Sequence, residues 1–202
     1  MSDRQLTGLV LAGGASERMG QDKALLELDG RAMIEVVTER LAEVCEEVWI
    51  VTDDARRYAH LGVPAVEDRF RGVGVLGGLH AGLTAATHEL ALAVACDMPF
   101  LNPHLLRAFA HWAEGYDVAI LRQGEQVEPL HAAYRRTCSA AIEAAILAGR
   151  RRVISFFSQV RVRYVDPHEV IPLDPKLASF VNVNTPEEWQ AVKATLDRAQ
   201  AS

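Results

Sequence analysis

The chain has 202 residues, and 27 acidic against 21 basic side chains give it a formal net charge of −6. Half of its residues are apolar and 24% are charged. This balance is typical of a globular protein and excludes a disordered or fibrous chain. A chain of this length usually forms one domain. No apolar run approaches the roughly 18 residues of a membrane-spanning helix, so we expect no membrane span.

Charge and cysteine content exclude further classes. The negative net charge argues against a nucleic-acid binder with a basic face, because such binding depends on many Lys and Arg contacts with phosphates. Any anionic ligand must therefore be held by local groups. The three cysteines, Cys45, Cys96 and Cys138, are odd in number and far apart. They predict neither a disulfide framework nor a zinc site, and we expect a cytoplasmic protein.

Short apolar runs alternate with amphipathic stretches over the first part of the chain. Strands are expected at Leu6–Ala12, Val48–Thr52, Val63–Val66, Leu90–Cys96 and Asp117–Leu121. Apolar residues at three- and four-residue spacing predict a surface helix over Ala32–Cys45. The run at 90–96 is apolar throughout, as expected when helices cover both faces of a parallel sheet. The alternation predicts an α/β fold.

The pattern is less regular after about residue 125. We expect a strand at Leu130–Tyr134, a helix from Cys138 to Ala148 and an edge strand at Arg161–Val165. A closing helix is expected at Glu187–Arg198, because Thr185 is a good N-cap and Pro186 suits the first helical position. No repeat or interdomain linker is apparent, so residues 1–202 are expected to form a single domain.

The most informative segment is Leu11-Ala12-Gly13-Gly14-Ala15-Ser16-Glu17-Arg18-Met19-Gly20-Gln21-Asp22-Lys23. It begins at the carboxyl end of a strand, where open α/β sheets bind ligands. Its glycines allow close approach of backbone N–H groups to phosphate oxygens, and Arg18 and Lys23 add positive charge. The alternative is a simple connecting turn with both cations solvated. The segment lacks the Walker A pattern.

A later run, Gly72-Val73-Gly74-Val75-Leu76-Gly77, imitates a dinucleotide-binding fingerprint, with Asp97 twenty residues beyond it. The fingerprint needs its first glycine directly after a strand, however, and the charged stretch 67–71 intervenes. Asp97 itself follows the apolar run 90–96 and is well placed to hold Mg²⁺, which takes one or two carboxylates plus phosphate oxygens. Asp97 as the cap of a helix near Pro103 is the weaker interpretation, because Asn102 is the better cap.

The glycine-rich segment resembles the signature L-A-G-G-x-S-x-R-M-G-x-D-K of Rossmann-like nucleotidyltransferases, most closely the molybdenum cofactor guanylyltransferases. Four further stretches are similar to motifs of that family: Asp97-Met98-Pro99, Gly72–Gly82, Glu128–Tyr134 and Phe180–Glu188. In the second of these, Val75 stands where the family has proline, which removes one fixed φ. The resemblance implies a three-layer Rossmann-like fold, with a mostly parallel central sheet and helices on both faces.

The resemblance also implies roles for individual residues. Nucleotide-binding residues would be Leu11, Ala12, Gly13, Gly14, Arg18, Lys23, Asp68, Gly78 and Asp97, of which Arg18, Lys23 and Asp97 would be catalytic. Asp97 would hold the metal, with Asn182 and Asn184 as further candidates that alternate along a strand. His131 and Arg151 would face a pterin.

Four of these assignments have structural alternatives. Asp68 can be read as a solvated loop acid, and the two asparagines as part of a capping network before the last helix. His131 can be read as a packed core residue, because a His on an apolar strand usually is one. Arg151 can be read as part of a solvated helix end.

The function implied by the resemblance is transfer of GMP from GTP to molybdenum-bound molybdopterin, with Mg²⁺ as cofactor. The nucleotide half would span about 1–115 and the pterin half about 116–202. A molybdenum-insertion protein and an apo-molybdoenzyme would be further partners, without nucleic acid or membrane. Two alternatives remain open. One is a related enzyme that uses CTP or activates another phosphorylated metabolite, and the other is a nucleotide-binding regulator without catalysis.

Overall fold

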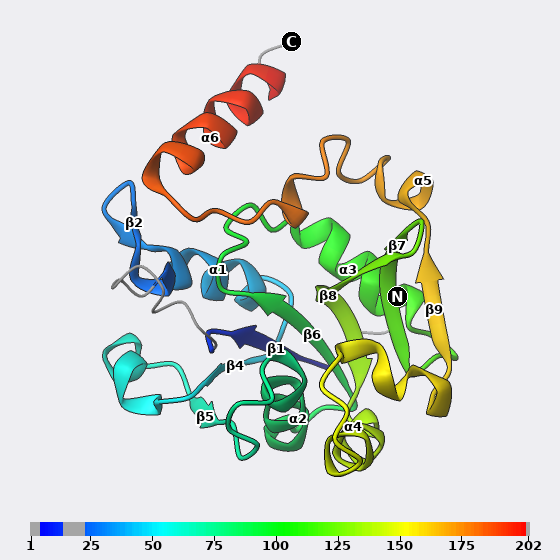
Figure 1. The fold of residues 1–202 in the computed structure, drawn as a ribbon. Helices are drawn as coiled ribbons and strands as arrows, with labels where there is room; N and C mark the ends of the chain where they lie inside the picture. The colour runs from blue at the N-terminus through cyan, green and yellow to red at the C-terminus, as the bar shows by residue number, and fades with distance from the viewer. Residues whose placement is uncertain (1–4, 14–22, 201–202) are drawn as a thin grey trace.

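A seven-stranded sheet forms the centre of the molecule, with strand order β5-β4-β1-β6-β8-β7-β9 (Figure 1). The computed structural model describes residues 5–13 and 23–200. The strands are β1 (Leu6–Leu11), β4 (Glu47–Thr52), β5 (Ala65–Glu67), β6 (Leu90–Ala95), β7 (Val118–Gln123), β8 (Gln126–Arg135) and β9 (Val162–Val165). Strands β5, β4, β1 and β6 are parallel to one another. Only β8 among these strands runs antiparallel to its neighbours, so the predicted mostly parallel sheet is confirmed.

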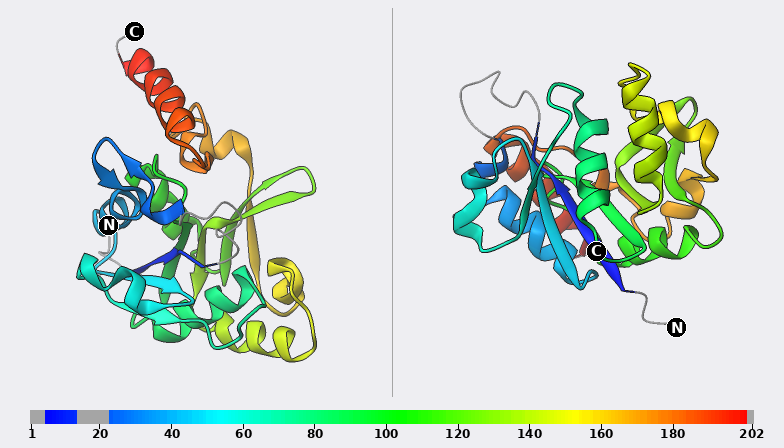
Figure 2. Two further views of the ribbon diagram at one scale, coloured as in Figure 1. Left: turned by 60° about the vertical axis from the view of Figure 1, so that its left-hand side comes forward. Right: turned by 90° about the horizontal axis from the view of Figure 1, so that it is seen from below.

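Four helices of 10 or 11 residues cover the sheet, two on each face, and together they make the predicted three layers (Figures 1 and 2). These helices are α1 (Met33–Ala42), α2 (Val75–Ala85), α3 (Pro103–Trp112) and α4 (Cys138–Leu147). The apolar residues of α1 and α3 share one core cluster, and those of α2 and α4 share the other. The remaining helices are α5 (Pro167–Val170), α6 (Pro186–Gln200) and the 3-10 segments η2 (Lys23–Leu25), η3 (Ala55–Leu61), η4 (Val153–Gln159) and η5 (Ala178–Phe180).

Strand β1 shows why its sequence is apolar throughout. Val10 packs in the core cluster of α1 and α3, whereas Leu9 and Leu11 pack in that of α2 and α4. Alternate residues of a strand point to opposite faces, so both faces must be apolar when both are covered. Gly8 lies where α1 comes closest, because a Cβ built on it would lie 2.5 Å from Leu41 Cδ2.

Helix α6 projects from the body and is held by its first turns (Figures 1 and 2). The ring of Trp189 stacks on Phe100, with the centroids 4.7 Å apart. Lys193 pairs with Asp29. Asp29 lies in the turn of a hairpin formed by β2 (Glu27–Leu28) and β3 (Arg31–Ala32). The hairpin was not predicted, although Asp-Gly is a strong hairpin signal; Asp29 and Gly30 both have positive φ, as a type I′ turn requires.

Several element boundaries differ from the predicted ones. Strand β8 begins at Gln126, four residues before the expected Leu130, and this extension places Glu128 in the sheet. The expected strand through Asn182 and Asn184 is wrong, because the described residues there form no ladder. The N–H of Val183 instead donates to the carbonyl of Asp97 at 2.8 Å, which holds this segment beside the end of β6. None of the described helices is both long and apolar enough to cross a membrane.

Candidate active site at the carboxyl edge of the sheet

The loops that follow β1, β4, β5 and β6 meet at one edge of the sheet, because parallel strands end on the same side. The loops after β1, β4 and β5 border a pocket of about 540 Å³. Its lining residues are Leu11, Gly13, Val51, Thr52, Asp53, Asp68, Arg71, Gly72, Gly74, Val75, Gly78 and Leu130. The predicted nucleotide-binding residues Leu11, Gly13, Asp68 and Gly78 are therefore brought together. Gly14 and Arg18 lie outside the described residues.

Ala12 and Gly13 fix the path of the chain into the pocket. The N–H of Ala12 donates to the carbonyl of Val51 at 2.8 Å, so the sheet ladder continues past the end of β1. A Cβ on Gly13 would lie 2.6 Å from Asp53 Oδ1, so this position requires glycine or a shift of Asp53. Asp53 was missed in the sequence, although it follows a predicted strand directly, as Asp97 does. The wall of the pocket at this point therefore consists of backbone atoms and the carboxylate of Asp53.

Asp68 is fixed at the other side of the pocket. Its Oδ1 accepts a hydrogen bond from the N–H of Phe70 at 2.7 Å. Burial raises the pKa of Asp68, and the nearby charge of Asp53 raises it further, although the bond from Phe70 acts in the opposite direction. A Cβ on Gly77 would lie 2.4 Å from Asp68 Oδ2, so the glycine leaves room for this carboxyl group. Asp68 is a partly buried pocket residue, and its interpretation as a solvated loop acid is wrong.

Asp97 lies two residues after the end of β6 and is partly buried. Burial raises the pKa of its carboxyl group, while the positive charge of Lys23 acts to lower it. Asp97 does not cap the following helix, because Asn102 Oδ1 accepts the bond from the N–H of His104 at 2.9 Å. The carboxylate thus has no structural role as a cap and lies within the electrostatic range of Lys23.

Lys23 and Asn184 meet beside Asp97, although they are 161 positions apart in the sequence. Lys23 Nζ donates to Asn184 Oδ1. The neighbouring Val183 is tied to the backbone of Asp97. Asn182 is exposed on the same segment. Three predicted residues, Lys23, Asp97 and Asn184, are therefore assembled from three separate parts of the chain.

Glu128 is a carboxylate of this region that sequence reasoning left out of the site. The pairing of β7 with β8 shifts register after Ile120, and such bulges redirect side chains. The N–H of Leu130 donates to Glu128 Oε1 at 3.1 Å. Burial raises the pKa of Glu128, and the charge of Asp97 raises it further. The signal was present in the Glu-Pro-Leu-His stretch, but the strand was predicted to begin too late.

The donors near Asp97 suit a hard cation that shares its ligands with a substrate. Among the described residues, no group of three or more His, Cys, Asp and Glu side chains could enclose a metal ion. Mg²⁺ does not need such a group, because it takes one or two carboxylates together with water and phosphate oxygens. Asp97, with Glu128 nearby, fits that requirement.

His131 does not line the pocket. Its side chain is fully buried between the rings of Phe109 and Phe180, at centroid distances of 5.1 and 4.5 Å. Burial lowers its pKa to about 4, so it is neutral near pH 7. Neither ring nitrogen has a hydrogen-bond partner in the described part of the chain. The expected contact with a pterin is contradicted by this burial, and the alternative of a packed core residue holds.

Arg151 contacts a loop that borders the pocket. Its Nη1 donates to the carbonyl oxygen of Gly72 at 2.8 Å. Gly72 has a φ of 79° and lines the pocket at the loop that leads into α2. Arg151 is thus exposed just past the end of α4, as the solvated alternative expects, and it is also attached to the loop before α2.

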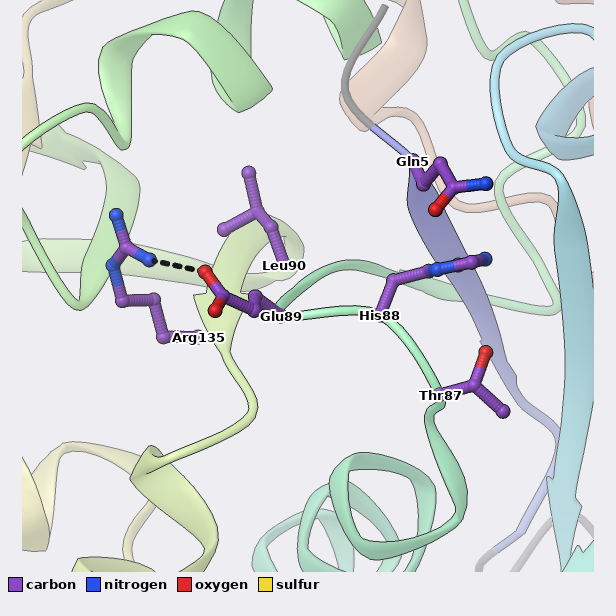
Figure 3. A pocket seen from close by; sticks show the side chains of 6 residues that line it. All are labelled: Gln5, Thr87, His88, Glu89, Leu90 and Arg135. Atoms are coloured by element: carbon purple, nitrogen blue, oxygen red, sulfur yellow. Dashed lines mark ion pairs between the residues drawn. The ribbon is translucent and has the colours of Figure 1, made fainter.

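A second pocket, of about 350 Å³, lies at the opposite edge of the sheet and is lined by Gln5, Thr87, His88, Glu89, Leu90 and Arg135 (Figure 3). Arg135 and Glu89 form an ion pair across it at 3.6 Å. The pocket lies at the start of β6, away from the carboxyl ends of the strands. It contains none of the predicted site residues, so we place the candidate active site at the carboxyl edge.

Comparison with known proteins identifies the family of the chain. The family model of the MobA-like NTP transferase domain matches residues 8–163. A relative from Pelotomaculum thermopropionicum, named "Probable molybdenum cofactor guanylyltransferase", is 45% identical over 91% of this chain and 90% of its own. A molybdenum cofactor guanylyltransferase from Desulfosudis oleivorans is 36% identical over 98% of both chains.

A solved structure from Archaeoglobus fulgidus, described as molybdopterin-guanine dinucleotide biosynthesis protein A, is also similar. It has a TM-score of 0.80 and 28% identity, and the match covers 95% of this chain and 99% of that one. The predicted Rossmann-like nucleotidyltransferase fold is thus confirmed. The family match covers the strands whose ends form the pocket. The chain belongs to the MobA-like NTP transferase family and is a nucleotidyltransferase.

Proposed function

We propose that this protein transfers GMP from GTP to the phosphate of molybdenum-bound molybdopterin, which gives the guanine dinucleotide form of the cofactor and pyrophosphate. The observation that carries the proposal is the meeting of Lys23, Asp97 and Asn184 beside a glycine-lined pocket. The names of the relatives supply the substrates. The alternatives of a CTP-dependent enzyme and of a non-catalytic regulator are not favoured by these relatives.

The reaction needs positioning and charge neutralisation more than a nucleophilic side chain. The phosphate of the pterin attacks the α-phosphorus of GTP in line, and the bond to the leaving pyrophosphate breaks. Lys23 and Arg18 neutralise the β- and γ-phosphates, helped by backbone N–H groups of Gly13 and Gly14. Lys23 is already held at this edge by Asn184. No covalent intermediate with the enzyme is required.

Asp97 would hold Mg²⁺, with Glu128 beside it and Asn182 and Asn184 within the same region. When bound, the ion supplies positive charge to the reacting phosphates. A partly buried carboxylate with a raised pKa suits this role, because burial makes its charge costly until a cation compensates it. The part of the chain before about residue 115 would bind the nucleotide, and the remainder would bind the pterin.

Asp68 and Gly78 would contact the nucleotide, because both line the pocket. The pterin would enter from the side of β8, where Leu130 borders the pocket. A protein that inserts molybdenum and an apo-molybdoenzyme that receives the product would be the natural partners of such an enzyme, and the cytoplasm its compartment. No nucleic acid or membrane is needed for the reaction.

The test compares the thermal stability of the protein with GTP, CTP, ATP and UTP, each with and without Mg²⁺. A ligand at a hundred times its dissociation constant stabilises by about 2.7 kcal/mol, which corresponds to several degrees for a chain of this size. We expect a shift with GTP and Mg²⁺ and formation of pyrophosphate when molybdenum-bound molybdopterin is added. A preference for CTP would move the assignment to the sister activity, and no shift with any nucleotide would refute the phosphate site.

A further inference from the structure

We propose that Glu188 is a positioning residue for Lys23 and acts through the side-chain amide of Asn184. The inference rests on the proposed function, in which Lys23 binds the phosphates of the nucleotide. Glu188 itself lies in the first turn of α6. It therefore affects the nucleotide site through another residue.

The three side chains form a chain of hydrogen bonds with one consistent direction. Asn184 donates twice to Glu188 Oε2, from its backbone N at 2.6 Å and from its Nδ2 at 3.2 Å. Lys23 Nζ donates to Asn184 Oδ1. A carboxylate only accepts hydrogen bonds and an ammonium only donates them. The amide satisfies both neighbours in one orientation, with its oxygen toward Lys23.

The backbone around Asn184 is held in place from both sides. The N–H of Glu188 donates to Thr185 Oγ1 at 3.1 Å, which caps the start of α6. Val183 donates to the carbonyl of Asp97, and Trp189 stacks on Phe100 in the loop after β6. The backbone of Asn184 is thereby fixed next to Asp97. Its amide can still rotate about the last side-chain bond, and the contacts with Lys23 and Glu188 together set this rotation.

Loss of Glu188 would leave the bond from Lys23 as the one described contact that orients the amide, so the amide would turn over more often. With the amide turned over, its NH₂ group would face the ammonium, and two donors cannot bond to each other. Lys23 would then be drawn to Asp97, since its charge already acts on that carboxylate. The ammonium of Lys23 would then pair with Asp97, the carboxylate that the proposed mechanism assigns to the metal. It would no longer be positioned to bind the nucleotide phosphates.

The experiment measures the dissociation constant of GTP in the presence of Mg²⁺ by calorimetry, with thermal stability recorded alongside. We expect Glu188→Ala to weaken GTP binding about tenfold, as loss of residues that orient a ligand-binding group commonly does. Glu188→Gln should bind GTP within about twofold of the unaltered chain, because its single amide oxygen can accept both bonds that Oε2 accepts here. Glu187→Ala is the matched control, because it removes the same charge from the same helical turn.

A double-mutant cycle with Lys23→Ala tests whether the effect passes through Lys23. We expect Lys23→Ala and Lys23→Ala/Glu188→Ala to bind GTP equally weakly, because the second change has nothing left to position. Additive losses would overturn the proposal, and so would equal effects of Glu187→Ala and Glu188→Ala. Those results would leave GTP binding by the unaltered chain intact. Absence of nucleotide binding by that chain would instead overturn the proposed function and, with it, this inference.

Discussion

The carboxylates at the two edges of the sheet have pKa values that are shifted in opposite directions. The parallel strands end at the carboxyl edge and begin at the amino edge. At the carboxyl edge, burial raises the pKa values of Asp68, Asp97 and Glu128. At the amino edge, hydrogen bonds from Arg161 lower the pKa of Asp117, and hydrogen bonds outweigh burial to lower that of Glu47 to about 2. A raised pKa means that the folded protein disfavours the charge, and a lowered one that it favours the charge. Burial therefore dominates the shifts at the first edge, and hydrogen bonding dominates them at the second.

The difference follows from what surrounds each group. Glu47, at the start of β4, accepts bonds from the hydroxyl of Thr7 and from the N–H of Thr87. Asp117, just before β7, accepts bonds from the backbone and guanidinium of Arg161. Among the described residues, the loops at the carboxyl edge offer the carboxylates fewer hydrogen-bond donors and border a pocket instead. We therefore expect stability to depend on the amino edge and binding of a charged ligand to depend on the carboxyl edge.

The strongest test of this contrast is Asp97→Ala. We expect turnover to fall at least about a hundredfold, the scale seen when one electrostatic contact of a transition state is removed. Some GTP binding should persist, because the pocket residues remain. Pyrophosphate release and calorimetry measure the two quantities. Asp117→Ala is the matched control at the amino edge: it should lower thermal stability and leave turnover unchanged. Normal turnover by Asp97→Ala would refute the metal assignment.

Two glycines of α2 allow binding and stability to be separated. A Cβ on Gly82 would lie 2.9 Å from Leu9 Cδ1 and 3.0 Å from Val51 Cγ2, inside the core. Overpacking of this kind costs about 1–3 kcal/mol, so Gly82→Ala should lower the melting temperature by several degrees. A Cβ on Gly77 would instead displace the carboxyl group of Asp68.

Gly77→Ala should therefore weaken GTP binding more than it lowers stability, because the end of one side chain can move without disturbing the core. Calorimetry measures GTP binding and thermal unfolding measures stability for both variants, so each variant is the control for the other. If Gly77→Ala bound GTP normally, Asp68 would have no role in nucleotide binding. If Gly82→Ala lost GTP binding while remaining fully stable, the division between core and pocket along α2 would be wrong.

The sequence was sufficient for the sheet and for the residues that directly follow parallel strands. Apolar runs such as 90–95 indicate central strands clearly, because a strand that is covered on both faces must be apolar on both. Asp97 could be found because it follows such a run. The glycine-rich stretches also pointed correctly to the pocket through Gly13 and Gly78. These are local patterns whose meaning does not depend on distant residues.

The features that could not be predicted from the sequence depend on tertiary contacts. The bulge that brings Glu128 near Asp97 is a matter of register between β7 and β8. The choice between the two interpretations of His131 depends on Phe109 and Phe180, which come from distant elements. The pairing of Lys23 with Asn184 joins two segments that no local periodicity connects.

A smaller effect is expected from Glu47→Gln at the amino edge. The carboxylate ordinarily titrates near 4.5, and in the folded protein its pKa lies at about 2. A group with a lowered pKa contributes stability above its unfolded value, and this contribution is lost as the pH falls from about 4.5 toward 2. The group is partly exposed, so we expect the substitution to cost only about 1 kcal/mol at pH 7.

Melting curves of both proteins from pH 7 to pH 2.5 measure this contribution. The unaltered chain should melt about 2–4 °C higher than Glu47→Gln at pH 7, and the two curves should converge as the pH falls. Turnover at pH 7 should be the same in both. A difference in melting temperature that persisted unchanged at pH 2.5 would show that the carboxylate charge is not the cause.

The smallest effect concerns Arg151, which links the two halves of the chain. Its bond to the carbonyl of Gly72 is exposed, so its loss should weaken GTP binding only about threefold, within the range of a single hydrogen bond. Arg151→Ala should raise the dissociation constant of GTP and leave the KM for the pterin substrate unchanged, and Arg152→Ala provides a neighbouring control. The resemblance to the family predicted the reverse, with Arg151 on the pterin side. A raised KM for the pterin with normal GTP binding would restore that assignment, and the contact with Gly72 would then be a resting position that the arginine leaves when the pterin arrives.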